Sequence, residues 1–336
     1  MTIEKNMLRK RANKLPTVTD EMWEKVHEEN QKIVQDYFDN NARLSDRTAK
    51  QYKSAMRQFF WWVYQKAGNK PVFKINKRDF NMYKSYLLRH GLSSGSIDFK
   101  QYAISSLCNH IDLMVIDYDP QYATFRNFTK NLPPLPKNTV YEKIPISKEE
   151  YKKLMDTLQK EEDYLAMAWV ATAFNCGGRR SELIQFKTEI LSYPFKKGKD
   201  GKELNYIETK PVRGKGAGND GKPLRYMINK EALHYMQLWV DQRGYEHEYI
   251  FTTKYNGEYK RVSPNWANYL CSQKLSRILG RRINPHLFKA TCITHKLEEG
   301  KSLEVVSKYI GHHAGTEVTK KHYDLRSDEE EKDLLF

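Results

Sequence analysis

Apolar residues recur with a helical period through most of the first 130 residues of the chain. The clearest case is the stretch 45–68, where they follow an i, i+3, i+4, i+7, i+8, i+11 spacing that places them on one face of an α-helix. That face consists of Tyr52, Ala55, Met56, Phe59, Phe60 and Val63. Ser45 or Asp46 can cap the start of this helix, and Gly68 lies just beyond its end. With further helical patterns around 77–90 and 95–114, the sequence predicts an all-α domain over residues 20–132.

The other face of the 45–68 helix is basic. Arg47, Lys50, Lys53 and Arg57 lie away from the apolar stripe, so we expect all four to present positive charge to solvent. Five more basic side chains fall within the first 14 positions, and they predict a basic N-terminal arm over residues 1–19.

A proline-rich stretch separates this domain from a second one. Four prolines fall within 131–147 and favour an extended chain that neither a helix nor a central strand tolerates, so we place a linker at 133–146. Ser147 and Glu150 then form a capping box that opens an amphipathic helix, and a second domain is predicted over 147–323. Residues 324–336, with six acidic and two basic side chains, form an acidic C-terminal tail.

A β-hairpin is predicted in one part of this second domain. The stretches 203–210 and 223–228 have the pattern of two short strands. The glycine-dense segment 211–222 between them is predicted to be a turn that carries Lys215 or Lys222 outward at its tip. The periodicity elsewhere is helical, so the predicted fold class is mainly α with a small β-hairpin sheet.

Composition narrows the class of protein. Lys and Arg number 57 against 42 Asp and Glu, a net charge of +15 that favours a polyanionic partner such as nucleic acid. The four cysteines lack the spacing of a zinc site or of a disulfide framework, so we expect no metal, no cofactor and reduced thiols in a cytoplasmic protein. No apolar run is long enough to cross a membrane.

Basic side chains in the second domain sit where an anion would bind. In AFNCGGRRSELIQF (173–186), Arg179 and Arg180 follow two glycines at the entry to a predicted helix, with Glu182 placed to orient one of them. In NPHLFKATCITHKLEEG (284–300), an asparagine cap and a proline open a helix. We expect His286 and Lys289 to lie on one face of that helix, at its positive end.

Two further residues complete the set. A short helix over 302–311 ends at Gly311, and His312 follows directly. Eleven residues later, Tyr323 comes after Lys320, Lys321 and His322, an unusual setting for a tyrosine that only packs in a core.

In this order, the motifs resemble the tyrosine recombinase (phage integrase) family over nearly the whole chain, and most specifically across 173–324. GGRRSEL resembles the family's first arginine motif, HLFK its His-x-x-Arg motif and IGHH its Leu-Gly-His motif. The catalytic set that the resemblance implies is Arg179, Lys215, His286, Lys289, His312 and Tyr323, with Glu182 in support.

The chain departs from the family pattern at two points. Lys289 stands where the family has its second arginine, which keeps the charge but loses a planar, two-pronged grip on phosphate. The segment from His312 to Tyr323 is also a residue or two longer than usual, so His313 stays an alternative to His312.

The resemblance also implies a fold and partners. The N-terminal helices are similar to the family's core-binding domain, which together with an α+β catalytic domain forms a C-shaped clamp on double-stranded DNA. The DNA contacts expected on this basis are Arg47, Lys50, Lys53, Arg57, Arg180 and Arg213.

The implied activity is that of a site-specific recombinase or integrase of a phage or mobile element. It would act as a homo-tetramer at the nucleoid, through a covalent 3′-phosphotyrosine and a Holliday junction, with directionality or DNA-bending proteins as accessory partners. It would need neither metal nor ATP. Two alternatives stay open: a member of the family that binds DNA without cutting it, which Lys289 makes plausible, and a topoisomerase-like nickase that acts without joining two sites.

Overall fold

The computed structural model describes residues 15–135, 143–216 and 221–326 of the chain. They form two units, and the division between the units falls at residues 140 and 141, in the proline-rich segment. The predicted N-terminal arm up to residue 14, positions 136–142 of the predicted linker and the acidic tail from residue 327 lie outside the described residues. Each unit is described by itself below.

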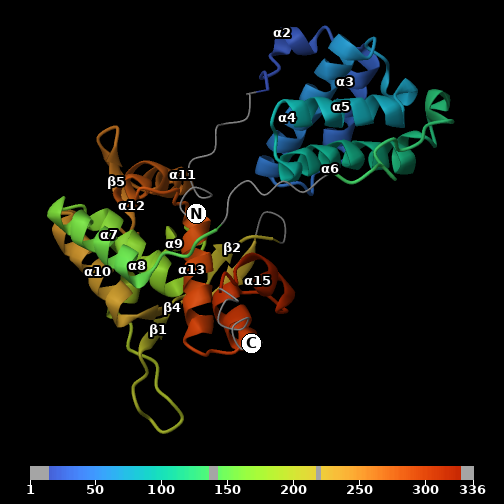
Figure 1. Cartoon of the computed structure of the whole chain (residues 1–336). Coiled ribbons are helices and arrows are strands. Elements are labelled where there is room, and N and C mark those ends of the chain that lie inside the picture. Colours follow the sequence, from blue (N-terminus) through green and yellow to red (C-terminus); the bar gives the residue numbers. More distant parts are fainter. Residues whose placement is uncertain (1–14, 136–142, 217–220, 327–336) are drawn as a thin grey trace. The chain divides into compact units, whose positions relative to one another are not determined.

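The first unit consists of helices (Figure 1). Its main elements are α3 (Glu28–Asp39), α4 (Asp46–Lys66), α5 (Lys77–Arg89) and α6 (Ser94–His110). Shorter turns complete it: α2 (Asp20–Trp23), η1 (Val72–Lys74), η2 (Ile111–Val115) and η3 (Pro120–Tyr122). Aromatic rings fill the core, with Phe59 in contact with Phe80, Tyr83 and Phe128. The predicted all-α architecture is confirmed for this unit.

Helix α4 follows the sequence pattern closely. Ser45 is its N-cap and accepts a hydrogen bond from the backbone N–H of Thr48. Five of the six positions of the apolar stripe are buried, and Tyr52 packs its ring edge-on against Phe99 at the margin of the core.

The basic face of α4 differs from the prediction at one position. Arg47, Lys50 and Lys53 are exposed, as expected. Arg57 instead donates hydrogen bonds to the carboxylate of Asp20 (2.6 Å) and to the backbone oxygen of Thr19 (3.0 Å), and its guanidinium lies over the ring of Trp23. The expectation that Arg57 presents a free charge is wrong, because the chain around α2 folds onto α4 and covers it.

The second unit is built around a buried helix. Nine of the thirteen residues of α8 (Tyr164–Cys176) are buried, so this helix has almost no polar face. It packs against α7 (Lys148–Lys160), α10 (Lys230–Gln242) and α13 (Pro285–Glu298) (Figure 1). The ring of Trp169 meets Trp266 and Phe288 at the centre of the core.

Short helical elements complete the second unit. They are α9 (Arg180–Leu183), η4 (Thr188–Ser192), α11 (Pro264–Tyr269), η5 (Leu270–Leu275), α12 (Ser276–Leu279), α14 (Leu303–Val306), η6 (Ser307–Gly311) and α15 (Glu317–His322). In neither unit does a described helix combine the length and apolar composition that a membrane span requires.

Three antiparallel strand pairs belong to this unit. The predicted hairpin is present, but its strands run further than expected: β1 (Tyr206–Glu208) pairs with β4 (Met227–Asn229), and β2 (Val212–Gly214) pairs with β3 (Lys222–Leu224). Residues 212–214 and 222, predicted to be turn, therefore belong to strands. Glycine suits position 214, since a Cβ atom there would lie 2.9 Å from the backbone oxygen of Lys222, which the strand pairing holds in place.

The third pair, β5 (Thr252–Tyr255) with β6 (Glu258–Arg261), was missed, and the prediction of helix throughout the rest of the domain is wrong there. Asn256 and Gly257 join the two strands with φ angles of +49° and +83°. Asn-Gly is the preferred pair for a two-residue hairpin turn, so the sequence did contain a signal.

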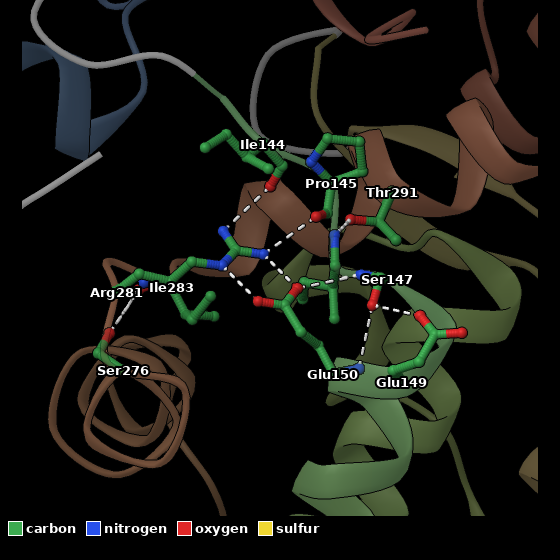
Figure 2. Close-up of polar contacts among 10 residues, drawn as sticks. Ile144, Pro145, Ser147, Glu149, Glu150, Ser276, Arg281, Ile283 and Thr291 are labelled. Atoms are coloured by element: carbon green, nitrogen blue, oxygen red, sulfur yellow. Dashed lines mark hydrogen bonds and ion pairs between the residues drawn. The ribbon is translucent and has the colours of Figure 1, made fainter. Parts of the chain in front are cut away.

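Arg281 ties the beginning of the second unit to its body. Figure 2 shows its guanidinium between the backbone oxygens of Ile144 (3.1 Å) and Pro145 (3.0 Å) and the carboxylate of Glu150 (2.6 and 2.8 Å). Glu150 also closes the predicted capping box with Ser147, which is confirmed. Only 8% of the Arg281 side chain is exposed, so the ion pair is largely shielded from water.

We predict that Arg281→Ala destabilises the second unit by about 2–3 kcal/mol, because a half-buried carboxylate loses its charged partner and two backbone oxygens lose their guanidinium donor. Arg277→Ala is the matched control: this side chain is 73% exposed and lies 3.9 Å from Glu161, so its loss should cost less than about 0.5 kcal/mol. Urea denaturation measures both. Equal losses in the two variants would contradict the role given to Arg281.

Candidate active site

The carboxylate of Glu182 is the anchor of the site. Glu182 lies in the four-residue helix α9 and is fully buried. Its oxygens accept hydrogen bonds from the backbone N–H of Arg179 (2.9 Å), from Nη1 of Arg179 (3.0 Å) and from the hydroxyl of Tyr226. Burial raises the pKa of Glu182, but the Tyr226 hydroxyl and the charge of Arg179 outweigh it, so the pKa lies below its ordinary value. The carboxylate is therefore ionised and holds Arg179.

Arg179 stands at the N-cap of α9, where the two preceding glycines bring the chain in tightly. A Cβ atom on Gly178 would lie 2.3 Å from the side chain of Leu183, so any larger residue at that position would force Leu183 to move. The Arg179 side chain keeps 19% of its surface exposed, enough to reach an external anion. Arg180 is half-buried and Arg213 is exposed.

Tyr226 belongs to the site although the sequence did not single it out. It lies between β3 and β4, and its ring meets that of His312 edge to face at 4.7 Å. Because the same side chain donates to Glu182, it connects the arginine to the histidine. In the sequence, Tyr226 looks like one more apolar position of a predicted strand, and no motif around it indicates a place in the site.

Helix α13 carries both His286 and Lys289 but places them in different environments. Its predicted start is confirmed: the Asn284 side chain accepts from the N–H of Leu287, and Pro285 is the first residue. His286 is exposed, but Lys289 is fully buried. The expectation that both are offered to an anion is wrong for Lys289, because this helix has buried neighbours around most of its circumference.

Lys289 makes its polar contacts inside the protein. Its Nζ donates hydrogen bonds to the backbone oxygens of Ile310 (3.0 Å) and Gly311 (3.1 Å), and lies 5.8 Å from the centre of the Tyr323 ring. Burial and the nearby charge of Arg179 lower the pKa of Lys289 to about 8.

His312 follows η6 in a left-handed backbone conformation, with a φ of +56° that is uncommon outside glycine. Its Nε2 is buried and has no hydrogen-bond partner in the described part of the chain. Burial and the charges of Lys289 and Arg179 lower the pKa of His312 to about 4, so the ring is neutral at neutral pH. The neutral ring thus has one buried nitrogen whose hydrogen-bonding capacity no described group uses.

His313, the alternative candidate, has a different setting. Its ring Nδ1 lies 2.9 Å from the hydroxyl of Thr319, and its backbone N–H donates to the backbone oxygen of Ser307. Its ring lies 5.6 Å from that of Tyr323. His313 is thus engaged in holding α15, whereas His312 has a free ring nitrogen among the described residues.

Tyr323 ends helix α15 and is placed by its own chain. Its backbone oxygen accepts from the hydroxyl of Thr294 (3.0 Å), and its ring packs against a small cluster that includes Ile293, Leu297 and Val306. The ring thus lies next to both Lys289 and His313.

The hairpin lysines are placed differently from each other. Lys215 directly follows β2 and is exposed. Lys222, opposite Gly214 in the ladder, lines a groove of about 610 Å³ together with His312 and His313.

Contacts inside one chain therefore join most of the expected site. One run of contacts leads from Arg179 through Glu182 and Tyr226 to His312. It continues through the adjacent Gly311 to Lys289, Tyr323 and His313. His286 lies one turn before Lys289 on α13, and no hydrogen bond or ring contact joins its side chain to this run within the described residues. Within the described residues, no group of three or more His, Cys, Asp or Glu side chains could hold a metal ion.

We predict that Tyr226→Phe destabilises the second unit by about 1–3 kcal/mol, because a buried carboxylate loses one of its three donors. Tyr269→Phe is the control, since that side chain is 70% exposed and its hydroxyl faces water. Thermal melting compares the two. A loss as small as that of the control would show that the hydroxyl of Tyr226 does not support Glu182.

A second prediction concerns pH. The pKa of His312 falls from an ordinary value of 6.5 to about 4 in the folded protein. The contribution of the neutral His312 ring to the free energy of unfolding is fully present above pH 6.5 and is lost as the pH falls toward 4. In this range the unfolded chain binds a proton at His312, whereas the buried ring in the folded protein does not. The charged groups acting on the ring are Lys289, Glu182, Arg179 and Lys222. Melting temperatures of His312→Asn should fall less over this range than those of the parent protein, and equal slopes would refute the assignment.

Comparisons with known proteins agree on one family. The model of the phage integrase family matches residues 145–330. A relative in Bacillus subtilis strain 168, the SPbeta prophage-derived recombinase-like protein YomM, is 54% identical over 99% of this chain and 98% of its own length. A tyrosine recombinase of Pseudothermotoga lettingae is 25% identical over 82% of this chain and 87% of its own length.

Solved structures share the fold. The Tn1549 transposon integrase, in complex with circular intermediate DNA, matches with a TM-score of 0.64 and 15% identity over 91% of this chain and 99% of its own. The XerH recombinase bound to its palindromic difH substrate matches with a TM-score of 0.61 and 14% identity over 98% of both chains. The predicted fold class and the predicted family are both confirmed: the chain belongs to the phage integrase family of tyrosine recombinases.

Proposed function

We propose that this chain is a site-specific DNA recombinase that cuts and rejoins DNA strands through a covalent link between Tyr323 and a 3′ phosphate. The observation that carries this proposal is the run of contacts from Arg179 to Tyr323 within one chain. It gathers a phosphate-binding guanidinium, a neutral histidine and a tyrosine from segments up to 144 residues apart. Such a combination suits phosphoryl transfer, in which most of catalysis is positioning and charge stabilisation.

Each side chain has a role that fits its environment. Arg179, held by an ionised carboxylate, would grip the non-bridging oxygens of the scissile phosphate. His312, whose Nε2 has no partner in the described chain, would donate a hydrogen bond to the same group. Both would stabilise the charge that grows on the phosphoryl group in the transition state.

The chemical step exchanges one ester for another. The hydroxyl oxygen of Tyr323 forms a bond to phosphorus while the bond to the 5′ oxygen of the next nucleotide breaks. His286 would accept the tyrosine proton, since partial loss of water around its ring and the charges of Arg179 and Arg180 lower its pKa and keep the ring neutral. Lys215, exposed on the hairpin, would give a proton to the departing 5′ oxygen. A 5′ hydroxyl from a partner strand reverses the step, so the energy of the phosphodiester is kept.

Double-stranded DNA is the proposed substrate. Arg47, Lys50 and Lys53 of α4 and Arg213 of β2 are exposed basic side chains, and the net charge of +15 favours a polyanion. Arg57 is left out because Asp20 neutralises it. The similar Tn1549 integrase and XerH recombinase are both described as bound to DNA. We further propose that both units of one chain contact the duplex, and that a homo-tetramer exchanges strands through a Holliday junction.

A second candidate function is DNA binding without cleavage. Its support is Lys289, which lies where the family pattern has an arginine and is buried rather than exposed. In that case Arg179 and the basic helix face would still hold DNA, but no covalent complex would form.

We predict that a DNA duplex nicked beside the cleavage point traps a covalent protein–DNA adduct, which survives denaturing electrophoresis. Tyr323→Phe should abolish the adduct, because the attacking oxygen is gone. Tyr255→Phe is the control: this tyrosine is exposed in β5 and should leave the adduct unchanged.

The outcomes separate the candidates. DNA binding without an adduct supports the non-cutting protein, and an adduct that persists in Tyr323→Phe means another nucleophile. Relaxation of supercoiled DNA without joining of two sites would indicate a nickase.

A further inference from the structure

Lys289 occupies a position that the proposed chemistry leaves unexplained. A lysine that contacts a bound phosphate must present its ammonium group to the DNA. Lys289 is fully buried, and its Nζ already donates to two backbone oxygens. Reaching a phosphate would break both hydrogen bonds and open the surrounding core.

The two acceptors are the oxygens of Ile310 and Gly311, at the end of η6. Carbonyl oxygens in the last turn of a helix lack partners within that helix and need donors from elsewhere. The next residue is His312, whose left-handed backbone is strained for a residue with a side chain. The ammonium group thus fixes the backbone directly before His312, and this backbone determines where the His312 ring points.

We propose that Lys289 is a positioning residue: it fixes the Ile310–Gly311 carbonyl groups, and through them His312 and the neighbouring Tyr323, instead of contacting the DNA phosphate. This inference rests on the proposed function, and in it Lys289 holds other residues of the site in place. The approach of Nζ to the Tyr323 ring, at 5.8 Å, places the same charge beside the nucleophile.

The packing around the two carbonyl groups explains why a lysine suits the position. A Cβ atom on Gly177 would lie 2.9 Å from the side chain of Ile310, and one on Gly311 would lie 3.0 Å from Nδ1 of His313 and 3.1 Å from the Thr319 hydroxyl. The segment is therefore confined on both sides. A guanidinium is wider than an ammonium group, so an arginine at 289 would push this segment out of place.

This gives a test in which the two roles predict opposite results. If Lys289 contacts phosphate, Lys289→Arg restores a two-pronged grip, and the adduct with nicked DNA forms as fast or faster. If Lys289 is a positioning residue, we expect adduct formation at saturating DNA to slow by about tenfold to a hundredfold in Lys289→Arg and in Lys289→Met. The dissociation constant for DNA should stay within about twofold of the parent value, since Lys289 does not touch DNA.

The matched control is Lys296→Arg on the same helix, which should behave as the parent because this side chain is 38% exposed and pairs with Glu299 at the surface. Melting curves establish that each variant is folded. A purely structural lysine would lower the melting temperature but leave the rate of the folded fraction unchanged, and that result would overturn the proposal.

An NMR titration of the histidine rings gives a readout that does not depend on cleavage. Removing the charge of Lys289 in Lys289→Met should raise the titration midpoint of His312, because that charge now disfavours protonation. An unchanged midpoint would contradict the proposed influence of Lys289 on His312. If the parent forms no adduct, the proposed function fails, whereas the titration still decides whether Lys289 controls His312.

Discussion

A carboxylate without access to water is the constraint on which the site depends. Removing the charge of Glu182 from solvent is costly unless donors replace the lost water, and here three do so. Two come from Arg179, one turn away, and the third comes from Tyr226, 44 residues later in the chain. The same charge therefore sets the direction of the arginine and joins α9 to the hairpin. Since the ring of Tyr226 also packs against His312, the position of the histidine depends on it as well.

Helix α13 performs the equivalent task with one lysine and two threonines. Three of its polar residues, Lys289, Thr291 and Thr294, are fully buried, and each bonds to backbone of another segment. Thr291 accepts from the N–H of Ile146 at the start of the second unit, and Thr294 donates to the oxygen of Tyr323 at its end. Lys289 holds the segment in between. A single helix thus brings the first and last parts of the unit together and places the tyrosine.

Local rules account for the elements that sequence predicted well. Ser45, the Ser147–Glu150 box and the Asn284–Pro285 pair act on backbone groups three or fewer residues away, so their effect is visible in the sequence. The apolar stripe of α4 was equally clear. The pair β5 and β6 was missed although Asn256 and Gly257 carry a turn signal, because its strands are only four residues each and mostly exposed. Arg57 was misjudged because Asp20 lies on a segment that no periodicity connects to α4.

The sequence by itself determined the family, the helical class and the order of the site residues, since these depend on residue types at short, recognisable spacings. Only the tertiary structure decided the surroundings of each one. It buried Lys289 against the end of η6, left a ring nitrogen of His312 free among the described residues and engaged that of His313 with Thr319. It also brought in Tyr226, which carries no mark of its own in the chain. The physical reason is that burial and hydrogen-bond partners come from segments far apart in sequence, and the solvation and charge state of a side chain depend on those neighbours more than on the residue itself.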